Sequence, residues 1–150
     1  MLVIDTGGGK NATITKRAWK VLHRTNHRTA MHGYQDKGPA KIYPIVNAVT
    51  KVHIPGRDLP VLFTLNYATL IDDPGERESL CVPFDLMRHH IAVDLTPTTL
   101  GGTGGIKVEG QNFPFEFDGE KLFYKISKPT EDDLDTLEWL ELTSPHPPCS

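Results

Sequence analysis

Glycine and proline interrupt this chain at short intervals, and that spacing constrains its fold more than any other feature. The 13 glycines and 12 prolines make up a sixth of the 150 residues. Both residue types are disfavoured inside helices and favoured in turns. The apolar residues between them fall in short runs and alternating patterns, as in residues 61–67, which are typical of strands. We therefore expect a mostly β protein.

The same patterns predict individual elements. We expect strands over residues 1–4, 45–54, 61–70, 79–82, 91–93, 106–108, 113–117 and 122–126. We expect helices over residues 16–23, 84–89 and 130–142. The last of these begins with Thr130 and three acidic residues, a favourable helix start, and would carry Leu134, Leu137 and Leu140 on one apolar face.

Composition indicates the compartment and excludes one class of protein. No apolar run approaches the roughly 18 residues that a transmembrane helix requires. The first residues lack the basic and apolar regions of a signal peptide. Cys81 and Cys149 are too few for a disulfide framework. We expect a cytoplasmic protein with reduced thiols and no membrane partner.

Charge is distributed unevenly along the chain. Residues 1–60 carry ten Lys and Arg against three acids, and residues 61–150 carry six against sixteen. A basic half of this kind is one signature of a nucleic-acid-binding domain, which stays an alternative. However, it lacks the interleaved aromatic residues that are typical of single-strand binders. We instead expect the two halves to attract each other or to be solvated, and we expect no nucleic-acid partner.

The strongest chemical signal is Val3-Ile4-Asp5-Thr6-Gly7. A buried strand that ends in Asp-Thr-Gly is what one half of an aspartic protease site requires, because glycine lets two backbones approach until two carboxylates share one proton. The chain holds a single copy of this tripeptide. The second aspartate would therefore come from a second copy of the chain, in a homodimer.

The tripeptide alone is a weak signal, since about 3% of chains of this length contain it by chance. The alternative is an ordinary turn in which Asp5 bonds its own backbone. The context favours the catalytic interpretation, because an apolar run precedes the motif and a glycine-rich turn follows it.

Two segments make residues 1–95 similar to a known family. Residues 5–15, followed by Ala18 and Leu22, and later residues 80–87 resemble the opening, and the closing strand and helix, of the retropepsin-like proteases of retrotransposon Pol polyproteins. The resemblance implies a retropepsin-like acid protease barrel that acts as a homodimer on a peptide or polyprotein substrate. It implies a catalytic set and a substrate-binding set, the second including a flap near residues 32–39: Asp5, Thr6 and Gly7 in the first, and Gly8, His32, Gly33, Tyr34 and Val82 in the second.

The resemblance also divides the chain. We expect a protease domain over 1–95, a glycine-rich linker over 96–105, a small β-hairpin and helix extension over 106–143, and a disordered tail over 144–150. A retropepsin fold kept as an inactive dimerising or peptide-binding module is the alternative function.

Cofactor sites are not indicated. A phosphate loop at residues 7–10 is disfavoured, because Ile4 stands where its first glycine belongs and Asn11 follows the lysine. His23, His27 and His32 have spacing that suits a metal, but apart from Asp36 no nearby Cys or carboxylate completes a tetrahedral set. We expect no metal and no organic cofactor.

Overall fold

The structure is a computed structural model that describes residues 1–4, 12–31, 41–71, 78–96, 100–102 and 104–143. Strands dominate the described residues, which confirms the mostly β prediction. In chain order the elements are β1 (Leu2–Ile4), β2 (Thr13–Thr15), β3 (Lys20–Met31), β4 (Lys41–His53), β5 (Val61–Ile71), β6 (Ser79–Cys81), α1 (Pro83–Arg88), β7 (Ala92–Asp94), β8 (Gly105–Val108), β9 (Gln111–Pro114), β10 (Glu116–Phe117), β11 (Leu122–Ser127), α2 (Glu131–Thr136) and β12 (Trp139–Glu141).

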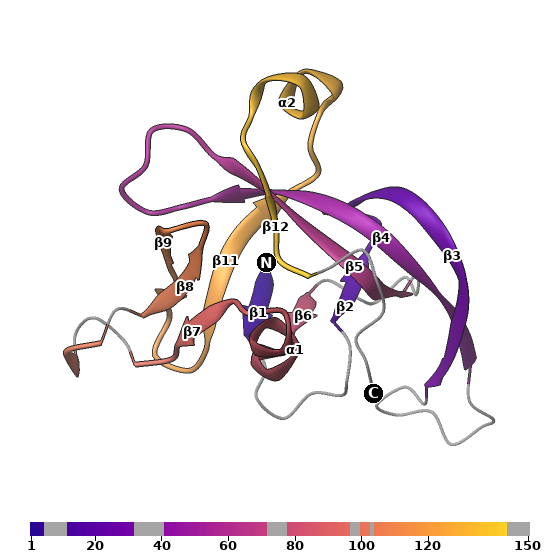
Figure 1. Ribbon diagram of the computed structural model, residues 1–150, viewed down its shortest axis with the longest axis horizontal. Helices are drawn as coiled ribbons and strands as arrows, with labels where there is room; N and C mark the ends of the chain where they lie inside the picture. The colour runs from indigo at the N-terminus through magenta and orange to yellow at the C-terminus, as the bar shows by residue number, and fades with distance from the viewer. Residues whose placement is uncertain (5–11, 32–40, 72–77, 97–99, 103, 144–150) are drawn as a thin grey trace.

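Most strands belong to one mixed sheet with the order β10-β11-β1-β6-β2-β5-β4-β3 (Figure 1). β11 also pairs with β4, so the pairings β11–β1–β6–β2–β5–β4 return to β11 and form a closed circuit of strands. β3 extends from β4 at the end of this order and pairs with no other described strand. A smaller antiparallel sheet, β7-β8-β9, lies beside β11 (Figure 1).

An aromatic cluster joins the two sheets. Phe63 of β5 lies edge-on to Phe113 of β9 and to Tyr124 of β11, with ring centroids 5.4 Å and 5.5 Å apart. The Tyr124 hydroxyl donates a 2.6 Å hydrogen bond to the Phe113 carbonyl oxygen. These side chains are nearly fully buried, so the smaller sheet packs on the main core rather than forming a core of its own.

The C-terminal strands complete the main sheet. β11 pairs with one edge of β1 in the antiparallel direction, and β12 pairs in parallel with β5. Three strands of the part predicted as a hairpin and helix extension, 106–143, therefore share a sheet with the N-terminal strands: β10, β11 and β12. The predicted tail, 144–150, lies outside the described residues, as does part of the predicted linker, 96–105.

The two helices are short. α1 begins with Pro83 at its first turn, where a missing N–H costs nothing. α2 begins with a capping box, in which the Thr130 side chain accepts a hydrogen bond from the Asp133 N–H and the Asp133 side chain accepts one from the Thr130 N–H. In the part of the chain that the structure describes, no helix is long and apolar enough to cross a membrane.

The helix predicted over residues 16–23 is wrong. Residues 16–18 form a turn, and β3 begins at Lys20. Ala18 and Val21 of the predicted apolar face do pack against the core, but Leu22 is 45% exposed. Pairing with the long β4 satisfies many more backbone groups than a helix of two turns, which is marginal by itself.

The helix predicted over residues 130–142 starts correctly and ends early. Leu137 already has extended backbone (φ −89°, ψ 153°), and β12 follows. Leu140 and Leu142 are 0% and 1% exposed, an alternation that suits a strand packed on the core. Pairing with β5 therefore outweighs the helical spacing of the leucines.

Replacing Leu140 by alanine tests the attachment of β12. We expect Leu140→Ala to lower the free energy of unfolding by about 3 kcal/mol, because it leaves a cavity in the core. The control Leu100→Ala removes the same atoms from a side chain that is 77% exposed. It should change the free energy of unfolding by less than about 0.5 kcal/mol. Urea unfolding followed by circular dichroism measures both. Equal losses in the two variants would contradict the packing of β12.

Candidate active site

The predicted catalytic motif starts at the residue after β1. Leu2, Val3 and Ile4 are all buried, so both faces of this strand are covered. β6 pairs with one edge in parallel, and β11 pairs with the other in the antiparallel direction. The strand that leads into the motif is therefore held on both faces and along both edges.

β6 lies between β1 and β2. Its Cys81 is opposite Ile4 of β1, and its Leu80 is opposite both Val3 of β1 and Thr13 of β2. Because β1 and β6 run in the same direction, their C-terminal ends leave the sheet side by side (Figure 1). The two segments that resemble the retropepsin-like proteases thus follow, or contain, neighbouring strands.

Val82 is the one predicted site residue that the structure describes. It follows β6 directly and precedes α1 with an extended backbone (φ −96°, ψ 116°) that any residue adopts without strain. Its side chain is 5% exposed. In a single copy of the chain Val82 is thus a packed residue at the end of β6.

The other predicted residues lie outside the described part of the chain, and their roles stay predictions. Asp5, Thr6, Gly7 and Gly8 fall within residues 5–11, which connect β1 to β2. His32, Gly33 and Tyr34 fall within 32–40, the predicted flap. That segment joins β3 to β4, which pair as far as Met31 and Lys41.

Trp19 is a supporting residue that the sequence analysis missed. Its indole Nε1 donates a 2.9 Å hydrogen bond to the Oγ of Ser79, and both side chains are buried. The bond attaches β6 to the chain just before β3. No local pattern signals it, because the two residues are 60 positions apart.

Asp85 is a buried carboxylate close to the end of β6. Its side chain is 9% exposed, and its Oδ1 accepts a 2.6 Å hydrogen bond from Arg88 on the same helix. The Nε2 of His89 lies 3.9 Å from the same oxygen. The pairing compensates part of the cost of burying the charge. This ion pair could have been predicted from the sequence, because Asp85 and Arg88 have the i, i+3 spacing of neighbours on a helix.

Cys81 is unsuited to nucleophilic chemistry despite its place beside β1. Burial, assisted by the negative charge of Asp85, raises the pKa of its thiol from 9.0 to about 12. The reactive form of cysteine is the thiolate, which is scarce at neutral pH when the pKa is this high. Cys81 therefore serves as a small apolar core residue opposite Ile4.

The predicted histidine cluster is only partly described. His23 and His27 lie on β3, and the His27 ring contacts Tyr67 at a centroid distance of 5.9 Å. His32 lies outside the described residues. Within those residues, no group of three or more His, Cys, Asp or Glu side chains is placed to hold a metal ion.

Comparison with known proteins does not name a family. No family model, no curated protein and no solved structure matches this chain. Any assignment of function therefore rests on the Asp-Thr-Gly motif, the resemblance of its surroundings and the strand arrangement around it.

The raised pKa of Cys81 predicts a pH dependence of stability. Above about pH 9 the unfolded chain loses the thiol proton while the native chain keeps it, so the native state binds more protons and stability falls as pH rises. Between about pH 8 and pH 10 we expect the wild type to lose about 1.4 kcal/mol more of its free energy of unfolding than Cys81→Ala loses.

Urea unfolding at the two pH values measures this change. Cys149→Ala, which removes the other thiol, is the matched control. A stability difference between the wild type and Cys81→Ala that is the same at both pH values would contradict the buried, neutral thiol.

Proposed function

We propose that this protein is an aspartic endopeptidase of the retropepsin type that works as a homodimer, with Asp5 of each copy as the catalytic acid. The observation that carries the proposal is the position of β1, a buried strand paired on both edges that ends at Ile4, one residue before the Asp-Thr-Gly motif. A strand held in this way suits a catalytic carboxylate that follows it and must point in one direction.

The chemistry needs two carboxylates and one water. When two Asp5 side chains approach closely, they cannot both ionise, so the pair retains one proton. The ionised member activates a water for attack on the peptide carbonyl carbon, and the protonated member polarises the carbonyl oxygen. In this scheme the Thr6 hydroxyl bonds across to the partner half, and Gly7 permits the close approach of the two backbones. This chemistry requires no metal or organic cofactor.

The substrate class follows from the same proposal. An extended segment of a polyprotein would lie in the cleft between the two copies as an added strand. We assign its binding to Gly8, His32, Gly33 and Tyr34. Val82, whose side chain is buried, would support this site from the end of β6 rather than contact the peptide through its side chain. The long β3–β4 hairpin supports the flap assignment, because it leads into 32–40 from two paired strands.

Asp5→Asn tests the catalytic role. The amide keeps the size of the side chain but cannot act as the base, so we expect cleavage to fall by at least about a thousandfold. The assay incubates a diverse peptide mixture, including peptides from a polyprotein, at about pH 4 to pH 7 and identifies new termini by mass spectrometry. Asp58→Asn, at an exposed position on the β4–β5 connection, is the matched control and should cleave like the wild type.

Mixing the chains tests the shared site. Excess Asp5→Asn protein should suppress wild-type cleavage, because each mixed dimer holds one carboxylate, and excess Asp58→Asn protein should not. If the wild type sediments as a dimer and binds peptides without cleaving them, and Asp5→Asn behaves identically, the inactive binding module replaces the protease.

A further inference from the structure

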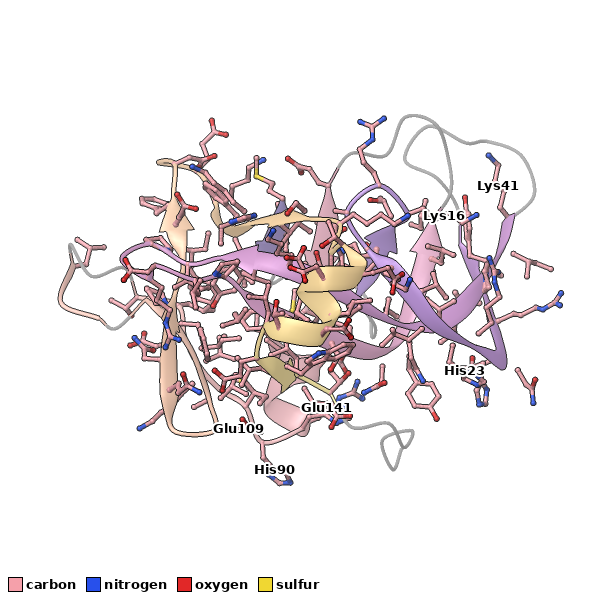
Figure 2. The ribbon with its side chains drawn as sticks, turned by 90° about the horizontal axis from the view of Figure 1, so that it is seen from above. Lys16, His23, Lys41, His90, Glu109 and Glu141 are labelled. Carbon is pink, nitrogen blue, oxygen red and sulfur yellow. The ribbon has the colours of Figure 1, made fainter. Side chains whose placement is uncertain are left out.

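The outer edge of β3 carries exposed positive charge. Arg24 and Arg28 are exposed. His23, which precedes Arg24, and His27, which precedes Arg28, are exposed as well. Figure 2 shows His23 and Lys41 on the side of the molecule that β3 and β4 form, far from the acidic Glu109. Two cations of the basic N-terminal part of the sequence, Arg24 and Arg28, are thus exposed on the same strand.

The two arginines have no acidic partner among the described residues. The ion pairs of that part of the chain involve the side chains of other cations, namely Lys20, Lys51, Arg88, Lys121 and Lys125, together with His89. Lys20, at the start of the same strand, is paired with Glu131 at 2.8 Å. An unpaired guanidinium offers up to five donors in a planar fork that fits phosphate or carboxylate oxygens.

The arginines border a hollow of about 320 Å³. β3 contributes Arg24, Thr25, His27 and Arg28 to its lining, and β4 contributes Ile42 and Pro44. The Thr25 hydroxyl donates a 2.7 Å hydrogen bond to the Ile45 carbonyl oxygen, and this bond attaches the β3 side of the hollow to β4. Ile42 is 68% exposed and gives the hollow an apolar rim.

The fold also brings an aromatic ring to this edge. Tyr67 of β5 makes an edge-on contact with the His27 ring, at a centroid distance of 5.9 Å. Its backbone has a positive φ of 60°, and its N–H donates a 3.0 Å hydrogen bond to the Asn47 Oδ1. The ring is only half-buried. The His27 ring, which lines the hollow together with the two arginines, thus also contacts the Tyr67 ring, although aromatic residues are not interleaved with the cations along the sequence.

We propose that this β3 edge, formed by Arg24, His27, Arg28, Ile42 and Tyr67, binds single-stranded nucleic acid. The arginines would contact phosphates, and bases would stack on the His27 and Tyr67 rings and the apolar rim. The proposal does not depend on Asp5 or on peptide cleavage.

An acidic peptide added to β3 as a further strand fits the structure less well. Strand addition requires a regular edge of free backbone groups. The pairing of β3 with β4 shifts register between Val21 and His23 and again between Arg24 and Arg28. Such irregularities hinder strand addition at a sheet edge. Binding through side chains, as a nucleic acid requires, is unaffected by them.

The test measures fluorescence anisotropy of a labelled single-stranded RNA of mixed sequence against the full chain. We expect Arg24→Gln/Arg28→Gln to raise Kd at least about tenfold at low salt and to reduce the slope of log Kd against log salt by about 1.4, since two phosphate contacts are lost. Lys107→Gln/Lys128→Gln is the matched control, because it removes the same charge from two exposed positions elsewhere and should raise Kd by less than about threefold.

Tyr67→Leu separates stacking from charge. We expect it to raise Kd by about fivefold or more while leaving the salt slope unchanged. Circular dichroism and thermal unfolding establish that each variant is folded, and peptide cleavage by Arg24→Gln/Arg28→Gln shows whether the two proposals fail separately.

Three results would overturn the proposal. The first is no binding of RNA at about 100 μM protein in about 50 mM salt. The second is equal weakening in the arginine variant and the lysine control, which would indicate non-specific charge attraction. The third is tighter binding of an oligoglutamate peptide that depends on the same arginines, which would make the partner an acidic peptide.

Discussion

The pairing of β1 on both of its edges is the constraint on which the rest of this structure depends. A strand of three residues is marginal by itself, and β1 is held because β6 and β11 arrive from positions far along the chain. The same pairings close the circuit of strands that runs through β2, β5 and β4. The N-terminal strand and the C-terminal part of the protein are consequently stabilised together, and the predicted catalytic segment follows a strand whose three residues are all buried.

The packing behind this strand explains how two sheets form one core. Phe63, Phe113 and Tyr124 come from β5, β9 and β11, and their rings meet in edge-on contacts. Tyr124 also satisfies its hydroxyl within the core, so its burial leaves no polar group without a partner. By contrast, β3 extends beyond the core at the end of the sheet order, where its charged side chains stay in solvent. The residues proposed to bind nucleic acid therefore lie around β3 at the end of the sheet order, whereas β1, which precedes the proposed catalytic segment, lies within the sheet.

Local patterns predicted part of this arrangement. The strand over residues 61–70 and the start of the helix at Thr130 were correctly predicted, because each depends on interactions within a few residues. Residues 16–23 and 137–142 were predicted as helix from apolar spacing, and both contain strands instead. Val21 packs beside β4 and Leu140 beside β5, and the backbone bonds gained there outweigh weak helical preferences. The hydrogen bond between Trp19 and Ser79 had no local signal at all.

By itself, the sequence determined that the chain is mostly β and that an Asp-Thr-Gly motif follows an apolar run. Only the tertiary structure decided that β11 and β6 enclose that strand, that β3 is a strand at the edge, and that Tyr67 lies beside His27. The reason is physical. Turn preferences and alternation act between near neighbours, whereas strand partners are chosen by the free energy of burying apolar surface and satisfying backbone groups from distant parts of the chain.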